Sequence, residues 1–142
     1  MAKVTLEQAN TIISAGQAKG REMGIGPLTI VVLDDGGHLV SMQREDKSGI
    51  LRFEIAFGKA WGGLAIGRSS RANEADILTR EHFGVALAAA SNGRIIPVAG
   101  GVLILDDEGL VAGAVGVTGD SSDNDEACAV AGIEAAGLTP KV

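Results

Sequence analysis

The fold is decided by the stretch Ile30-Val31-Val32-Leu33-Asp34-Asp35-Gly36-Gly37-His38-Leu39-Val40, in which two apolar runs flank a tight turn. The first run, Leu28–Leu33, is almost entirely apolar and rich in β-branched residues, which predicts a strand covered on both faces. Asp34–Gly37 has the composition of a hairpin turn, and the return strand follows over His38–Arg44. The stretch therefore predicts an antiparallel hairpin whose first strand is buried.

A second hairpin is predicted later in the chain. Its strands are Val102–Asp106 and Leu110–Val117, and the turn between them reads Asp106-Asp107-Glu108-Gly109. This turn resembles the first one, because both place aspartates before a glycine at the end of an apolar run.

Helical segments precede, separate and follow the two hairpins. Thr5-Leu6-Glu7-Gln8 has the composition of a capping box, and small and apolar residues then recur at helical spacing as far as Gly20. A clear apolar stripe at helical spacing runs through the middle of the chain. The stripe consists of Phe53, Ala56, Phe57, Ala60 and Leu64, and further helices are predicted over Asn73–Leu78, Glu81–Ala90 and Asp125–Ala136, the last capped by Ser122–Asp125.

The order helix, hairpin, helices, hairpin, helix predicts an α+β fold with one antiparallel sheet and helices packed on it. A length of 142 residues fits a single domain over 1–142, and no linker or low-complexity segment interrupts it. Hydrophobic residues make up 46% of the chain and aromatic residues only 3%, so we expect an aliphatic core.

Charge and cysteine content exclude several classes of protein. The formal net charge is −6 and no basic run occurs, so nucleic acid is not an expected partner. No apolar run is long enough for a membrane span, and no secretory signal precedes the first helix, so we expect a cytoplasmic protein without membrane contact. Cys128 is the one cysteine, and His38 and His82 lie too far apart for a helical metal pair, so no metal site is predicted.

Taken together, these segments resemble the GlcG/HbpS family, which includes heme-degrading-domain-like proteins and is related to the C-terminal domain of PduO-type proteins. The resemblance follows the same order along nearly the whole chain. It rests on residues 30–40 with Gln43-Arg44, on Lys59-Ala60, on Pro97–Val102, on Gly113–Gly119 and on Asp125–Ala129.

The resemblance implies a profilin-like antiparallel sheet with two hairpins and about five strands, flanked by helices, in a homo-oligomer. Family members are associated with heme binding, with corrinoid and propanediol metabolism, with glycolate operons and with breakdown of aromatic compounds. Heme and a catabolic pathway are therefore what the resemblance implies. The chain departs from the usual pattern at Glu45–Ile50, which replaces a short Asp-Gly-Ala, and over Arg68–His82.

Two cationic residues are candidates for ligand binding. Arg44 ends a strand, and its guanidinium either holds a substrate carboxylate or heme propionate in bidentate fashion or pairs at the surface with Glu45 or Asp46. Lys59 lies away from the apolar stripe of its helix, so its side chain is either solvated or a cation that faces a pocket between subunits.

Other candidates lie on helices and at strand ends. Glu54 is either a carboxylate base or a solvated helix residue. His82 is either a ligand of heme iron and a proton shuttle or a helix-start residue packed on its neighbours, whereas His38 is expected at the surface. Two dipeptides, Gly100-Gly101 and Thr118-Gly119, either let a ligand approach backbone amides closely or serve turn geometry alone.

Three functions remain open from the sequence. The leading hypothesis is a small-molecule-binding protein, with heme or an anionic organic acid held by Arg44, Lys59 and the glycine turns. The alternative is a cofactor-free enzyme, a hydrolase, tautomerase or deaminase, acting on a small oxo-acid or an aromatic ring-cleavage product. In that enzyme Arg44 is the clamp, His82 or Glu54 the acid or base and Lys59 the electrophile. The third is an accessory subunit that packs on partners through its small-residue helices.

Overall fold

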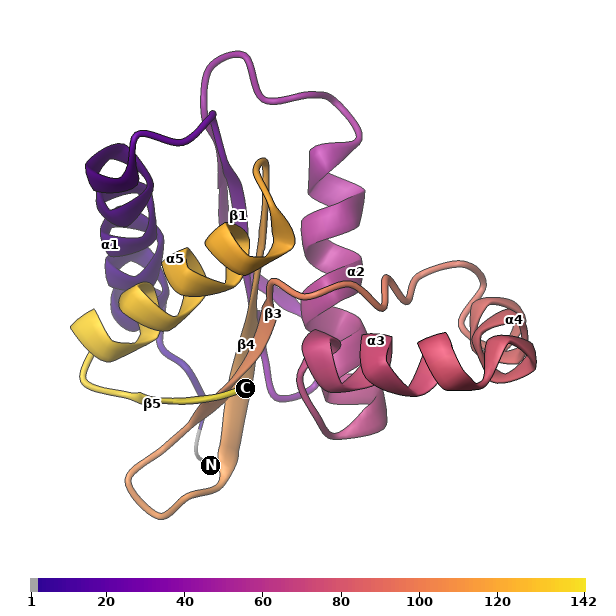
Figure 1. Ribbon diagram of the computed structural model, residues 1–142. Helices are drawn as coiled ribbons and strands as arrows, with labels where there is room; N and C mark the ends of the chain where they lie inside the picture. Colours follow the sequence, from indigo (N-terminus) through magenta and orange to yellow (C-terminus); the bar gives the residue numbers. More distant parts are fainter. Residues whose placement is uncertain (1–2) are drawn as a thin grey trace.

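The computed structural model describes residues 3–142, and Figure 1 shows one sheet with helices on both of its faces. The sheet has five strands in the order β2-β1-β4-β3-β5, and each neighbouring pair is antiparallel. The predicted α+β fold is thereby confirmed. The elements are α1 (Leu6–Met23), β1 (Thr29–Asp34), β2 (Leu39–Arg44), α2 (Arg52–Ile66), α3 (Ser70–Thr79), α4 (Glu81–Ala90), β3 (Gly101–Leu105), β4 (Val111–Thr118), α5 (Ser122–Ala135) and β5 (Thr139–Lys141).

Both hairpin turns are held by the same side-chain arrangement. Asp34 Oδ1 accepts hydrogen bonds from the backbone amides of Gly36 and His38 at 2.9 and 3.0 Å. Asp106 Oδ1 accepts bonds from the amides two and four residues further on, both at 2.9 Å. An aspartate that bonds the following amides fixes the turn locally. The likeness of the two turns in the sequence is therefore a likeness in structure.

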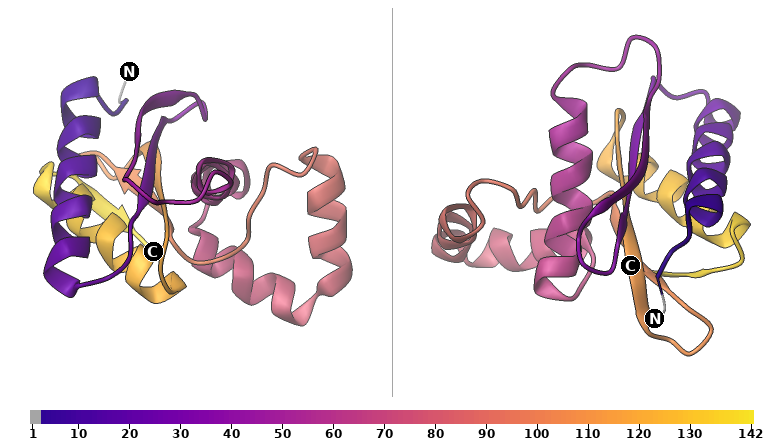
Figure 2. Two further views of the ribbon diagram at one scale, coloured as in Figure 1. Left: turned by 90° about the horizontal axis from the view of Figure 1, so that it is seen from above. Right: turned by 180° about the vertical axis from the view of Figure 1, so that it is seen from behind.

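The sheet is covered on both faces, as Figures 1 and 2 show. α1 and α5 lie on one face, where Ile30 and Val32 of β1 point, and α2 lies on the other, where Val31 and Leu33 point. Because side chains alternate along a strand, a strand between two helical layers must be apolar at every position. The five residues from Thr29 to Leu33 are all buried, which confirms the prediction for this strand.

α2 packs close to the sheet because small residues form the contact. Ala56 and Ala60 are fully buried against it, and a Cβ at Gly116 of β4 would lie 1.9 Å from the Ala56 carbonyl oxygen. The bulky members of the predicted stripe, such as Phe53 and Phe57, are only half-buried at its edge. The stripe is therefore divided between the contact with the sheet and the outer side of the helix.

α3 and α4 form an arm that extends from the body of the molecule (Figure 2). Within the described chain, α4 contains no buried residue, and Leu78 and Val85 on the arm are 75% and 72% exposed. The chain returns from α4 along α2, where the amide of Ile96 donates to the Gly58 carbonyl at 3.2 Å. The returning segment then leads into β3.

Several element boundaries differ from the sequence prediction, among them the start of α3 at Ser70 instead of Asn73, and one strand is added. α5 begins at Ser122, three residues earlier than expected, because the Ser121 hydroxyl caps it by accepting a bond from the Asn124 amide at 3.2 Å. β5 pairs with β3 at the sheet edge, although Pro140 lies in its middle. Proline is tolerated in an edge strand, where its missing N–H is not needed.

None of the helices in residues 3–142 combines the length and the apolarity that crossing a bilayer requires.

Candidate functional site

Most of the predicted ligand-binding residues meet at one end of the sheet, the end from which the loop between β2 and α2 departs (Figure 1). β2 ends there with Arg44, β4 ends with Thr118, and β3 begins with Gly101. Thr29 of β1 pairs with both Arg44 and Thr118, so the three form a row across the strands. Residues opposite each other point to the same face, and alternation from Val31 makes this the α2 face.

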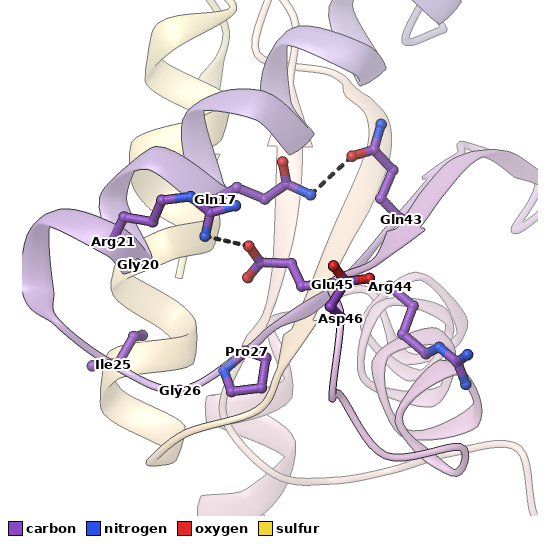
Figure 3. Close-up of a pocket in the computed structure, with 10 residues that line it drawn as sticks. All are labelled: Gln17, Gly20, Arg21, Ile25, Gly26, Pro27, Gln43, Arg44, Glu45 and Asp46. Carbon is purple, nitrogen blue, oxygen red and sulfur yellow. Dashed lines mark hydrogen bonds and ion pairs between the residues drawn. The ribbon is translucent and has the colours of Figure 1, made fainter.

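Arg44 has no partner inside the described chain. No hydrogen bond or ion pair of its guanidinium exists among residues 3–142, and Figure 3 shows it directed away from Gln43 and Glu45. Glu45 pairs with Arg21 instead. The surface ion pair with Glu45 or Asp46, which the sequence left open, is therefore not formed.

Arg52 is a second guanidinium at this end of the sheet, and sequence reasoning missed it. It is the first residue of α2, and its Nη1 donates to Thr118 Oγ1 at 2.7 Å. No side chain in the described residues caps this helix, because Leu51 stands at its N-cap. The one sequence signal was position, since only Leu51 separates Arg52 from the unusual loop Glu45–Ile50. Arg44, Arg52 and Thr118 are called the arginine cluster below.

The arginine cluster differs from the other arginines of the chain. Within the part that the structure describes, three of the other five pair with carboxylates and two lie over aromatic rings. These five are Arg21, Arg68, Arg71, Arg80 and Arg94. Arg44 and Arg52 have neither kind of partner, although the chain carries 18 acidic residues. The cluster is therefore a local concentration of uncompensated positive charge in an acidic protein.

Lys59 lies beneath this end of the sheet in a buried ion pair with Asp125 of α5. Their side chains are 3% and 2% exposed, and Lys59 Nζ lies 3.2 Å from Asp125 Oδ2 and 3.0 Å from the Val117 carbonyl oxygen. Burial lowers the pKa of Lys59 and raises the pKa of Asp125, because desolvation disfavours both charges. Of the two placements that the sequence suggested for Lys59, the one in solvent is wrong, and the one facing a pocket between subunits stays a prediction.

The predicted glycines make room for backbone of this same chain. A Cβ at Gly101 would lie 2.3 Å from the Lys59 carbonyl oxygen. Gly100 has a φ of 124°, in the region that favours glycine, and its Cβ would lie 2.7 Å from the Val117 carbonyl oxygen. A Cβ at Gly119 would lie 2.2 Å from the Pro27 carbonyl oxygen. Their missing side chains therefore allow the strand ends to pack closely against α2 and against the backbone that leads into β1.

The three residues that the enzyme hypothesis needs do not converge. Glu54 is exposed on the outer side of α2, whereas Lys59 on the same helix is buried toward β4 and α5. His82 is the second residue of α4, on the arm, and it is exposed. An acid, a base and an electrophile act together only within hydrogen-bond reach of one substrate. The arrangement in one chain therefore gives the enzyme hypothesis no support.

A polar groove of about 530 Å³ runs between α1 and the end of β2 (Figure 3). Gln17 Nε2 donates to Gln43 Oε1 at 2.9 Å, Arg21 pairs with Glu45, and Glu45 Oε1 accepts a bond from the Leu28 amide at 2.9 Å. These polar groups largely satisfy one another. Arg44 also lines this groove, but among the described residues it takes no part in these interactions.

An apolar groove of about 460 Å³ lies on the outer side of α2. Phe53 and Phe57 line it with their ring centroids 5.9 Å apart, and Leu51 and Ile96 add aliphatic walls. Leu51 and Phe53 flank Arg52 in the sequence, so the groove begins beside the arginine cluster.

Ligands for a metal or for heme iron are scattered. His38 lies in the turn between β1 and β2 with 81% of its side chain exposed, and His82 lies on the arm. Burial raises the pKa of Cys128 to about 11, so its thiol stays protonated, and the chain has no tyrosine. In residues 3–142 no three His, Cys, Asp or Glu side chains are grouped for a metal ion.

Comparison with known proteins places the chain in a family. Residues 4–134 match the model of the family described as haem degrading protein HbpS-like. An uncharacterized 15.0 kDa protein of Citrobacter freundii, from the dhaT-dhaS intergenic region, is 29% identical over 125 residues, which cover 88% of this chain and 86% of that protein.

Solved structures agree with this assignment. Protein ORFY of Klebsiella pneumoniae is 25% identical with a TM-score of 0.84, over 96% of this chain and 92% of that one. The crystal structure of a PduOC–heme complex has the same fold, with a TM-score of 0.86 over 99% of each chain and 18% identity. With residues 4–134 matched, the chain belongs to the HbpS-like family, which is described as haem degrading protein HbpS-like.

Proposed function

We propose that this protein binds a small molecule through the carboxylates of that molecule, and that the arginine cluster is the binding site. The observation that carries the proposal is that, within residues 3–142, Arg44 and Arg52 lack a carboxylate or aromatic partner, whereas the other arginines have one. Heme is the first ligand to test, because the family is described by haem degradation and PduOC, which shares the fold, forms a heme complex.

The electrostatics of the cluster favour an anion. A guanidinium offers a planar fork of N–H donors that matches a carboxylate in bidentate fashion. Arg52 begins α2, whose uncapped first turn adds the positive end of the helix dipole. Arg44 and Thr118 lie two strands apart, which is about 10 Å. The cluster therefore spans enough sheet for two carboxylates of one ligand.

Apolar side chains next to the cluster suit a flat ring. Ile50 and Leu51, which directly precede Arg52, are 86% and 64% exposed. Phe53, which follows Arg52, leads into the apolar groove on α2. Exposed aliphatic and aromatic side chains of this kind gain free energy when a ligand covers them. A planar apolar molecule with carboxylates thus has partners for both of its parts.

Heme fits this site in part. Its propionates and its ring edge match the guanidinium groups and the apolar side chains. Its iron has no ligand at the cluster, because the two histidines and the cysteine of the chain lie elsewhere. We therefore describe the ligand class by its carboxylates and ring, and no step of the proposal passes through iron.

Titration with hemin, followed by absorbance, tests the proposal. We expect saturable binding by the unmodified protein and at least about tenfold weaker binding by Arg44→Gln, because a charge-assisted hydrogen bond is lost. Arg80→Gln is the matched control, since Arg80 lies over Phe83 on the arm, and it should bind like the unmodified protein. Equal affinities in all three proteins would refute the role of the cluster.

Self-association, which the family resemblance implies, is part of the proposal. The arm exposes Leu78 and Val85, and apolar surface of this kind marks contact sites. Light scattering of the protein and of Val85→Glu checks this, because contact through the arm predicts a lower mass for the variant. An unchanged mass would place the contact elsewhere.

A further inference from the structure

We propose that the site recognises the ring and the carboxylates of a porphyrin and not its iron, so that metal-free protoporphyrin IX binds about as tightly as hemin. This inference rests on the proposed function, since it assumes a ligand at the arginine cluster. Its basis is the position of every side chain in the described residues that could coordinate iron.

The first such side chain, His38, is at the wrong end of the hairpin. It precedes β2, whereas Arg44 is the last residue of β2. Six strand residues separate the two positions by about 20 Å. His38 Nδ1 also lies 3.4 Å from Oδ1 of Asp34, the residue that ends β1. A porphyrin with its carboxylates on Arg44 and Arg52 does not bring its centre to this turn.

The second histidine, His82, lies on α4 at the outer end of the arm, away from the sheet end where β2 and β4 finish (Figure 1). Cys128 is fully buried in α5, on the sheet face opposite to the cluster, and its raised pKa leaves it as a thiol. Neither residue reaches a ligand that is held by the arginine cluster within one chain.

The methionines of the described chain are occupied by packing. Met42 is two residues before Arg44 on the same face, but it packs on the core between the sheet and α2. Met23 packs on the core of the opposite face. Since tyrosine is absent from the chain, no other common axial ligand remains. The contacts that the site offers are therefore the ones that a metal-free porphyrin also makes.

The test compares hemin, protoporphyrin IX and the dimethyl ester of protoporphyrin IX on the same protein. Quenching of Trp61 fluorescence, the one tryptophan of the chain, reports all three titrations. We expect dissociation constants for hemin and protoporphyrin IX within about threefold of each other. The ester should bind at least about tenfold more weakly, because its carboxylates no longer accept charge-assisted hydrogen bonds.

A variant with both histidines replaced, His38→Ala/His82→Ala, is the second arm of the test. Unchanged hemin affinity in this variant supports the inference. If hemin binds at least about tenfold more tightly than protoporphyrin IX and loses that advantage in the variant, iron ligation by histidine overturns the inference but leaves carboxylate binding intact. If neither porphyrin binds saturably, the proposed function fails with heme as its ligand, and the inference fails with it.

Discussion

Two groups of positive charge lie at the same end of the sheet and differ in what faces them. Lys59 is buried against Asp125 and the Val117 carbonyl, so its charge is compensated inside the chain. Arg44 and Arg52 face the same end of the sheet without a carboxylate, and Arg52 bonds only a hydroxyl among the described residues. The difference shows that a cation near a candidate site is a ligand-binding group only if the fold leaves it uncompensated.

The buried pair has a structural consequence. It joins α2 to the first turns of α5 and to the end of β4, because Lys59 Nζ donates to both Asp125 and the Val117 carbonyl oxygen. Asp125 Oδ1 also accepts a bond from the amide of Asp120, in the loop between β4 and α5, at 2.9 Å. A buried ion pair adds little net stability, but removing one partner leaves a buried charge uncompensated. We infer that the pair holds the frame on which the arginine cluster is mounted.

The largest expected effect comes from breaking the buried pair on one side. Lys59→Met should lower the free energy of unfolding by about 3–5 kcal/mol, because Asp125 stays buried without its counter-charge. The double variant Lys59→Met/Asp125→Leu should recover most of this loss, since no charge is left in the interior. Urea unfolding measures both. A single variant as stable as the unmodified protein would show that Lys59 is not buried as described.

The pH dependence of the same single variant sharpens the comparison. Burial raises the pKa of Asp125 above its ordinary value of 3.8, so the folded chain keeps a proton that the unfolded chain has lost. The contribution of the Asp125 carboxyl to the free energy of unfolding is therefore greatest at low pH, and it is lost as the pH rises through the pKa of Asp125 in the folded chain. Lys59→Met should be more stable at pH 5 than at pH 8, by at most about 1.4 kcal/mol per pH unit.

Urea unfolding at the two pH values checks this, with Lys59→Met/Asp125→Leu as the control without the titrating carboxyl. The single variant should show the larger difference between pH 5 and pH 8. A difference of equal size in both variants would assign the pH dependence to other groups.

The smallest expected effect on stability belongs to the arginine cluster. Arg44→Gln and Arg52→Gln should each change the free energy of unfolding by less than about 1 kcal/mol, because neither removes an ion pair. Urea unfolding measures this beside the hemin titration, in which the variants should lose affinity. A large loss of stability in Arg44→Gln would show that the residue supports the fold and would contradict its assignment to ligand binding.

Local chemistry explains which parts of the fold were predictable. The two hairpins follow from turns whose aspartates bond amides within four residues, so a single segment carries the whole signal. The capping box of α1 is equally local, with Thr5 and Gln8 bonding each other's backbone amides. β5 was not placed, because its three residues include Pro140 and its pairing depends on a distant strand.

The candidate site was harder to predict because its meaning depends on neighbours that are distant in the sequence. Arg44 was identified from the sequence. Arg52 was not, because it joins the site through its hydrogen bond to Thr118, which is 66 residues further along the chain. Lys59 and Asp125 are also 66 residues apart in the sequence, so no local sequence pattern predicts that they pair. Gly101 was predicted to admit a ligand, whereas in the fold its missing side chain admits the backbone of α2.

The central claim, that Arg44 and Arg52 hold the carboxylates of the ligand, is tested most directly by the NMR signals of the arginine Nε–H groups. Protoporphyrin IX is diamagnetic and is titrated into isotope-labelled protein. We predict that the signals of Arg44 and Arg52 shift with saturation, while those of the ion-paired Arg68 and Arg71 stay in place. Saturable shifts confined to other arginines, or none at Arg44 and Arg52, would contradict the claim.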